Sequence, residues 1–411
     1  MTKMNVADVE FVKELYPRLK PDDAAIERYR DALDNLPPII VARGRVLVDG
    51  YHRWQAHRRE EVTEIAVQDL GDLTDTEIFN ESIRRNAAHG QQLSRQDKKH
   101  VAEKLWQTLA HLPNAERITE IASLLAVAER SVQAWTKDAR TDEKKHAQAK
   151  AWDLWLDCWT QESIAEQVGM AQRTVADWLA ESAKLRKLLE PPESRQHFDV
   201  WQFQTADKDA GSQSYFGAIP PQVVENLLWL YTEPGDVVVD LFAGSGTTID
   251  VAKSMGRRVW ASDIRGDHYS PHLPIHKHDA TTGWPKDAPK ASLLLLDPPY
   301  WKQAQGRYST EPNELGEMDL EPFYSAWAKV LKAAKGKADR IAYIISPTHN
   351  DDGSVTDHAT DMLKAAWTAG FTVERRIIVT YQTQQATGQQ VTWARDNKRL
   401  LKLYRDLVIL R

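Results

Sequence analysis

The C-terminal half of the chain contains apolar runs that end on carboxylate residues. Val237–Val239 lead into Asp240, and later runs end at Asp263, Asp279 and Asp297. Short apolar runs separated by helical patterns are typical of a parallel sheet covered by helices on both faces. Because parallel strands end at one edge of a sheet, these carboxylates are expected to share a ligand site. The expected strands, up to seven, are Val237–Leu241, Arg258–Asp263, Pro274–His278, Ser292–Asp297, Arg340–Ser346, Val373–Tyr381 and Tyr404–Leu410.

The first run continues into a glycine-rich turn with the sequence DLFAGSGTT, residues 240–248. Glycines let the backbone pass close to a ligand, and the N–H groups that start the next helix can face an anion. Asp263 follows about 20 residues later, where an acidic side chain can bind both hydroxyls of a ribose. This spacing favours a nucleoside-containing cofactor over a simple strand-to-helix turn. Asp279 could bind an adenine amino group or could cap a helix.

The tetrapeptide Asp297-Pro298-Pro299-Tyr300 directly follows the fourth run. Its prolines fix the backbone and lack N–H donors, so the Asp297 carboxylate and the Pro298 carbonyl can accept hydrogen bonds from one exocyclic amino group. Two acceptors favour a pyramidal, nucleophilic nitrogen, and Tyr300 could stack on the base. A duplex buries this nitrogen, so the nucleotide would have to be flipped out. The alternative is a plain turn after a strand.

With these motifs, residues 197–411 resemble the amino-group DNA methyltransferases that use S-adenosyl-L-methionine. The resemblance implies a Rossmann-like sheet of seven strands. It also implies that the methionine part of the cofactor lies along the glycine turn, the ribose at Asp263 and the target base at Asp297. The cofactor-binding candidates are Asp240, Phe242, Gly244, Gly246, Thr247, Asp263 and Asp279, and the catalytic candidates are Asp297, Pro298, Pro299 and Tyr300.

The expected target is adenine N6, because members of that family with Asp-Pro-Pro-Tyr mostly methylate adenine. Cytosine N4 is the alternative, although enzymes with that target usually carry serine at the first position. Methylation at cytosine C5 requires a nucleophilic cysteine, and the only cysteine, Cys158, lies in the central helical segment. Two loops of this segment carry basic residues that could contact DNA phosphates or could be ordinary surface charges. They are Lys302 and Arg307, in the loop after the motif, and Arg395, Lys398 and Arg399, in the loop Gln382–Leu400.

The central segment repeats itself, since Ile121–Trp135 aligns with Ile164–Trp178 at an offset of 43 residues. The apolar positions coincide, which indicates an internal duplication. Both copies have the spacing of a helix-turn-helix motif, whose second helix enters the major groove of DNA. Helical hairpins that merely pack are the alternative. The residues expected to contact DNA are Arg130, Ser131, Gln133, Arg173 and Thr174.

The N-terminal segment has the pattern of a small α/β unit. Its segments Val46–Ala56 and Glu81–Arg85 resemble the two motifs of the ParB-like N-terminal domain, a fold shared with sulfiredoxin. The resemblance implies DNA binding and a pocket for CTP or another nucleotide. The expected elements are a helix over Asp22–Leu36 and strands at Ile39–Val41, Val46–Asp49 and Glu64–Asp69. The pocket candidates, which could equally have structural or DNA-phosphate roles, are Gly50, His52, Arg53, Arg84 and Arg85.

This segment departs from the family pattern at two points. Ser82 replaces the asparagine expected near a bound metal, and no cysteine precedes His52-Arg53. Nucleotide hydrolysis is therefore doubtful, and the reductase chemistry of sulfiredoxin is excluded.

The patterns divide the chain into a ParB-like segment 1–92, a helical segment 93–190 and a methyltransferase segment 191–411. The net charge of −6 does not indicate nucleic-acid binding, but it does not exclude it either, because a local basic patch is sufficient. One cysteine excludes an internal disulfide framework, and no metal site is expected. We expect a cytoplasmic, nucleoid-associated enzyme that acts on double-stranded DNA without membrane attachment, with a homodimer conceivable. Rival hypotheses are a non-catalytic ParB-like partition protein and a methyltransferase of RNA or of protein glutamine.

Overall fold

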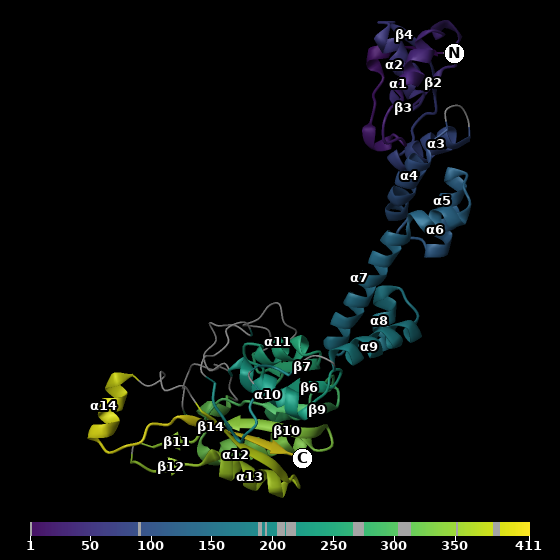
Figure 1. Cartoon of the computed structure of the whole chain (residues 1–411). Coiled ribbons are helices and arrows are strands. Elements are labelled where there is room, and N and C mark those ends of the chain that lie inside the picture. Colours follow the sequence, from purple (N-terminus) through teal and green to yellow (C-terminus); the bar gives the residue numbers. More distant parts are fainter. Residues whose placement is uncertain are drawn as a thin grey trace. The chain divides into compact units, whose positions relative to one another are not determined.

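The computed structural model describes residues 2–88, 92–187, 191–193, 195–203, 210, 219–265, 275–302, 314–350, 352–380 and 387–411. Its contacts divide the chain into two compact units, Met1–His146 and Ala147–Arg411. Figure 1 shows both units and labels most of their elements. These units differ from the three expected segments, because the second repeat belongs to the same unit as the C-terminal sheet and the first repeat does not.

The first unit begins with a four-stranded sheet in the order β1-β4-β2-β3. Three strands match the expected positions, whereas β1 was not expected because its sequence, TKMN, contains no apolar run. The helix expected over Asp22–Leu36 ends at Arg30, and a short 3-10 turn follows at Leu33–Asn35. The elements are β1 Thr2–Asn5, α1 Asp23–Arg30, β2 Ile39–Ala42, β3 Val46–Asp49, α2 Tyr51–Arg59, β4 Glu64–Asp69 and α3 Asp75–Ala88.

The two repeats form pairs of helices joined by three residues each, at 126–128 and 169–171. In both copies the second helix buries its expected valine, Val132 or Val175. Trp178 is buried as expected, whereas Trp135 is only half-buried against the core of its unit. The helices of this region are α4 Arg95–Thr108, α5 Asn114–Leu125, α6 Glu129–Trp135, α7 Lys137–Leu156, α8 Gln161–Val168 and α9 Gln172–Arg186.

The turns of the two repeats place different residues in the same left-handed conformation. Ala126 caps α5 with φ +49°, and Gly169 caps α8 with φ +64°. Since a Cβ in this region costs roughly 1 kcal/mol, we expect Ala126→Gly to stabilise the first unit by about that amount. Gly169→Ala should destabilise the second unit similarly, because a Cβ there would meet no atom within 4 Å and only the backbone is affected. Unfolding midpoints of both variants that equal the wild-type values would contradict this prediction.

The second unit is built on an eight-stranded sheet in the order β5-β13-β14-β10-β9-β6-β7-β8. Seven strands lie where the apolar runs predicted them, and the eighth is the two-residue β5 at one edge. Strand β14 runs antiparallel to both of its neighbours, and the other pairs are parallel. The strands are β5 Val200–Trp201, β6 Val237–Asp240, β7 Arg258–Asp263, β8 Ile275–Lys277, β9 Ala291–Leu296, β10 Ala338–Ile345, β13 Val373–Thr380 and β14 Tyr404–Leu410.

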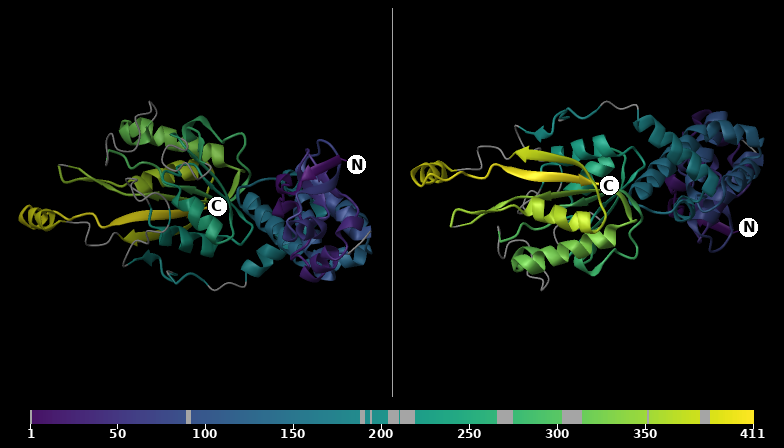
Figure 2. Two further views of the ribbon diagram at one scale, coloured as in Figure 1. Left: turned by 90° about the horizontal axis from the view of Figure 1, so that it is seen from above. Right: turned by 90° about the horizontal axis from the view of Figure 1, so that it is seen from below.

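Helices cover both faces of this sheet (Figures 1 and 2). One core cluster contains Val224 and Ile249, and the other contains Trp327 and Met362. The strand order reverses between β6 and β9, which is the point where open α/β sheets bind ligands. The helices are α10 Pro221–Tyr231, α11 Thr247–Ser254, α12 Leu320–Ala334, α13 His358–Thr368 and α14 Gly388–Asp396, and a separate hairpin consists of β11 Thr348–His349 and β12 Val355–Thr356.

The end of α7, which leads into the second repeat, packs directly on the helix and strand that follow the glycine turn. The Arg258 guanidinium lies 3.6 Å from the centre of the Trp155 ring and donates to the Trp155 carbonyl at 3.2 Å. Lys253 of α11 forms an ion pair with Asp157 at 2.5 Å. Stacked guanidinium groups and partly buried ion pairs hold elements more firmly than exposed pairs do. Ala183 and Arg186 of α9 likewise lie against Gly235 and Gly256. The α8–α9 pair is therefore an integral part of the second unit.

No helix in the described part of the chain is both long enough and apolar enough to cross a membrane.

Candidate active site

The glycine turn after β6 is fixed by carboxylates at both of its ends. Asp240 Oδ1 accepts a hydrogen bond from the Phe242 N–H at 2.9 Å, and Asp263 Oδ2 accepts one from the Gly244 N–H at 3.0 Å. Gly244 and Gly246 have φ values of +49° and +86°, and Gly246 is the N-cap residue of α11. Side chains with a Cβ rarely adopt these angles, which explains the two glycines. The turn directs the start of α11 towards the carboxyl edge of the sheet.

Two further carboxylates, Asp263 at the end of β7 and Asp279 after β8, lie along the same edge. Asp263 also accepts a hydrogen bond from the Arg265 N–H through Oδ1, so both of its oxygens stabilise the local backbone. Asp279 Oδ1 accepts from the Thr281 N–H at 2.9 Å and caps a 3-10 turn. Of the two roles considered for Asp279, the cap is present in the structure. A carboxylate oxygen has more than one acceptor site, so neither contact excludes a bound ligand.

Asp297 lies at the carboxyl end of β9, beside the reversal of strand order. Its Oδ1 is buried and has no hydrogen-bond partner among the described residues. Burial raises the pKa of this carboxyl to about 6, although Arg405 and the Tyr300 hydroxyl act in the opposite direction. Burial likewise raises the pKa of Asp240 to about 7. An unsatisfied buried acceptor is costly, and such groups are commonly retained for function.

These residues line one pocket of about 880 Å³, part of which is open to solvent. All the catalytic candidates and all the cofactor-binding candidates except Gly246 line it. Sequence analysis missed Arg265 and Glu314, which also line it. Carboxylates, backbone N–H groups at a helix start and an apolar wall fit a cofactor with a ribose, an amino acid part and a base.

Because the pKa of Asp297 is raised, replacing this carboxyl with a neutral amide should stabilise the protein by an amount that depends on pH. The folded state holds this proton more tightly than the unfolded state, so the wild type loses stability as pH rises from about 4 to about 6. We expect Asp297→Asn to match the wild type near pH 4 and to be up to roughly 3 kcal/mol more stable at pH 8. Unfolding followed at both pH values measures this, with the exposed Asp287→Asn as control. A stability difference that does not change with pH would refute it.

The structure contains a polar network that ends on the Trp301 carbonyl and that the sequence did not predict. His358 is fully buried, and its ring nitrogens contact the Tyr324 hydroxyl and the Thr348 hydroxyl at 2.9 Å each. Thr348 donates onward to the Trp301 carbonyl at 3.3 Å. Burial lowers the pKa of His358 to about 4, so the ring is neutral. The network joins two helices to the residue after Tyr300, and no local sequence signal marks it.

The candidates for DNA contact in the repeats are accessible. Arg130, Gln133 and Arg173 are exposed, and Ser131 and Thr174 are half-buried. Lys302 lies 3.8 Å from Asp319 in an ion pair, and Arg307 lies outside the described residues. Cys158 is half-buried, and burial raises its pKa to about 11, which keeps the thiol protonated. A protonated thiol is a poor nucleophile.

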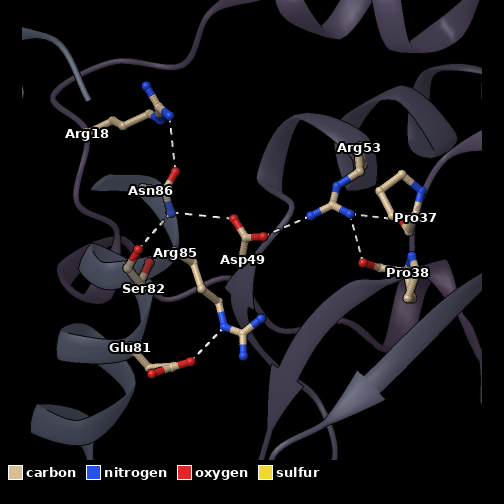
Figure 3. Close-up of polar contacts among 9 residues, drawn as sticks. All are labelled: Arg18, Pro37, Pro38, Asp49, Arg53, Glu81, Ser82, Arg85 and Asn86. Carbon is tan, nitrogen blue, oxygen red and sulfur yellow. Dashed lines mark hydrogen bonds and ion pairs between the residues drawn. The ribbon is translucent and has the colours of Figure 1, made fainter. Parts of the chain in front are cut away.

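In the N-terminal unit, Arg53 is bound by protein acceptors (Figure 3). Its guanidinium donates to the carbonyls of Pro37 and Pro38 and to Asp49 Oδ2, at 2.8 to 2.9 Å. Asn86, which the sequence analysis did not single out, donates to Asp49 Oδ1 at 3.4 Å. Arg53 therefore joins strand, helix and loop, and an anion would have to compete with these contacts.

The other pocket candidates of this unit differ in their availability. Burial lowers the pKa of His52 to about 4, and its Nε2 accepts from the Asp22 N–H, so it carries no positive charge at neutral pH. Arg85 pairs with Glu81 at 2.7 Å, and Arg84 is exposed. Gly50 has φ +97° at the start of α2. A pocket of about 1140 Å³, part of which is open to solvent, lies here, and all these candidates except Arg84 line it.

Comparisons with known proteins point to DNA methylases. A family model described as DNA methylase, that of the N6/N4 methyltransferases, matches residues 95–270. This match covers both repeats, the glycine turn and Asp263, and it ends before Asp297. The Type II methyltransferase M.BglII of Bacillus subtilis is 31% identical over 71 residues, which are 17% of this chain and 20% of that relative. The chain thus matches about a fifth of that protein's length.

Two solved structures resemble parts of the chain. The C-terminally truncated chromosome-partitioning protein ParB from Caulobacter crescentus, complexed to the centromeric parS site, is 16% identical with a TM-score of 0.26. The match covers 44% of this chain and 100% of that one. A SAM-dependent methyltransferase from Archaeoglobus fulgidus is 13% identical with a TM-score of 0.30, covering 46% of this chain and 93% of that one. These scores are too low to define the fold of the whole chain.

Proposed function

We propose that the chain is a DNA methyltransferase that uses S-adenosyl-L-methionine and acts on the exocyclic amino group of a flipped base, with adenine N6 as the preferred target. The observation that carries the proposal is the buried Oδ1 of Asp297, which accepts no hydrogen bond from any residue that the structure describes and lies in the pocket that Asp240 and Asp263 also line. A free acceptor at the switch point of the sheet is what an amino group entering from outside requires.

The residues of the pocket divide the work between cofactor and base. Asp263 binds the ribose, and the glycine turn with the start of α11 binds the amino acid part of the cofactor. When bound, S-adenosyl-L-methionine supplies a methyl group activated by a positively charged sulfur. Asp297, ionised above pH 6, and the Pro298 carbonyl accept hydrogen bonds from the two N–H groups of the target amino group. Tyr300 provides the wall on which the flipped base stacks.

The N-terminal unit and the second repeat locate the DNA in this proposal. The exposed Arg130 and Arg173 at the two second helices contact phosphates or base edges of the major groove. The cavity beside Gly50 accepts CTP or another nucleotide, held by Arg85 once Glu81 is displaced. A cytoplasmic, nucleoid-associated location follows from this role. A rise in unfolding temperature with CTP, absent in an Arg85→Ala variant, would support the nucleotide site, and no response to any nucleoside triphosphate would reject it.

The target is identified by product analysis. Purified protein is incubated with S-adenosyl-L-methionine and unmethylated DNA or RNA, and the digested nucleosides are measured by mass spectrometry. N6-methyladenine in DNA supports the proposal, and N4-methylcytosine establishes the alternative base. Methylation of RNA alone would exclude DNA as the substrate. A cofactor that binds without any methylated nucleoside would favour the non-catalytic partition protein.

A further inference from the structure

We infer that the segment 387–403, between β13 and β14, is a second DNA-binding surface, which holds the duplex beside the Asp297 pocket. The inference rests on the proposed function for the identity of the polymer, DNA. It deepens that proposal by naming an element that neither the repeats nor the motifs account for. Four observations support it: position, charge, exposure and attachment.

The first observation is position, which the strand directions determine. Strand β14 is antiparallel to both β13 and β10, and β10 is parallel to β9. The end of β13 and the start of β14 therefore lie at the edge where β9 leads into Asp297. Arg405, the second residue of β14, is close enough to lower the pKa of Asp297. Both ends of the segment are therefore attached to strands at the edge of the sheet where Asp297 lies.

The second observation is charge. The segment 387–403 contains four basic residues and one acidic residue, in a chain whose net charge is −6. Arg395 and Lys398 are exposed, and they stand at the end of α14 and just beyond it. Arg395 forms an exposed ion pair with Asp396 at 3.5 Å, the kind of pair that contributes little and leaves the guanidinium accessible. A local cationic surface on an acidic protein is attractive to a polyanion. Double-stranded DNA is the polyanion that the Asp297 pocket requires.

The third observation is an exposed apolar surface on the same element. Trp393 is 56% exposed and Val391 is 52% exposed, on a helix that projects from the sheet in Figures 1 and 2. A large aromatic side chain among exposed cations suits contact with the faces or sugars of nucleotides. An exposed ring contributes little to the stability of the free protein, and its burial against a bound partner would stabilise the complex.

The fourth observation is attachment to a second projecting element. Arg399 lies over Gly353 in the β11–β12 hairpin, where a Cβ would overlap the guanidinium. Ser346, at the end of β10, donates to the Tyr404 carbonyl at 3.2 Å and closes the base of the segment. The hairpin begins at Thr348, which is tied to Trp301 as described above. The surface is thus coupled to the residue that follows Tyr300.

The test compares three full-length variants for binding of a duplex at several salt concentrations. Arg395→Gln with Lys398→Gln should weaken binding about tenfold and should lower the slope of log Kd against log salt by roughly two, because each phosphate contact contributes about 0.9. Trp393→Ala should weaken binding about fivefold without changing the slope, since stacking releases no counterions. The matched control is Lys332→Gln with Lys337→Gln, because both lysines are exposed and lie near the amino end of β10, at the opposite edge.

The first unit is identical in all variants, so its own contribution to DNA binding is the same in each. Any difference between the variants therefore comes from the substituted residues. Wild-type affinity and slope in both test variants, or equal losses in the control, would overturn the inference. A change from dimer to monomer in sedimentation, with DNA affinity unchanged, would overturn it too and assign the surface to a second copy of the chain. Failure of the proposed function appears separately, as absence of methyl transfer by the wild type, and S-adenosyl-L-methionine affinity should be equal in all variants.

Discussion

Asp297→Ala is expected to lower methyl transfer to DNA by about 10³-fold, the size of effect seen when one preorganised polar group is removed from a reaction centre. The variant should still bind S-adenosyl-L-methionine with an affinity near that of the wild type, because the glycine turn and Asp263 are unchanged. The reason for the loss is geometric. Only the Pro298 carbonyl would then accept from the amino group, and the nitrogen would keep its lone pair delocalised in the ring.

The rate should be measured in single turnover with saturating DNA, so that product release does not hide the chemical step. Asp287→Ala is the matched control, because it removes an exposed carboxylate from the loop before β9. In the wild type the rate should fall on acidification through pH 6, as Asp297 takes up a proton. A variant that retains a tenth of the wild-type rate would show that Asp297 is not the principal acceptor.

Asp263→Ala is expected to weaken S-adenosyl-L-methionine binding by about 100-fold. Hydrogen bonds to a charged group each contribute roughly 1.5 to 3 kcal/mol, and ribose binding would lose at least one of them. The substitution also removes the acceptor of the Gly244 N–H, so the glycine turn loses its tie to β7. Binding energy and turn geometry are therefore lost together.

Asp263→Asn separates these two contributions, because an amide oxygen can still accept from the Gly244 N–H. We expect this variant to bind the cofactor with an affinity between those of the wild type and Asp263→Ala, as titration calorimetry would measure. Equal affinity of wild type and Asp263→Ala would move the cofactor away from this strand end. If both variants lost affinity for the cofactor equally, the hydrogen bond to the Gly244 N–H would contribute nothing to binding, and the whole loss would be due to the ribose contact.

The sheet of the second unit was largely predictable because its strands are buried and continuously apolar. Strand β9, with four leucines, and β10 follow the expected ranges closely. Two strands were not expected: the two-residue β5 of this sheet, and β1 of the first unit, whose sequence TKMN contains one apolar residue; both pair at sheet edges. Edge strands are stabilised by a partner's backbone, which the local sequence does not encode.

The sequence predicted the site residues that lie in contiguous motifs, but not the contacts that other segments make with them. The carboxylates after β6, β7, β8 and β9 converge because parallel topology brings strand ends together. The influence of Arg405 on Asp297 and the hydrogen bond from Thr348 to the Trp301 carbonyl join segments distant in sequence. The internal hydrogen bonds of Arg53 likewise depend on the carbonyls of another segment. The division of the chain at His146 depends on packing such as that of Trp155 on Arg258.

The central claim is that the pocket beside Asp297 places a methyl group on a base of DNA. It is tested most directly with S-adenosyl-L-methionine carrying an isotopically labelled methyl group, followed by mass spectrometry of the nucleosides from the DNA. We predict label on an exocyclic nitrogen with the wild type, and none with Asp297→Ala at equal cofactor occupancy. Label in the DNA of both proteins, or cofactor bound by the wild type with no label in DNA, would contradict the account.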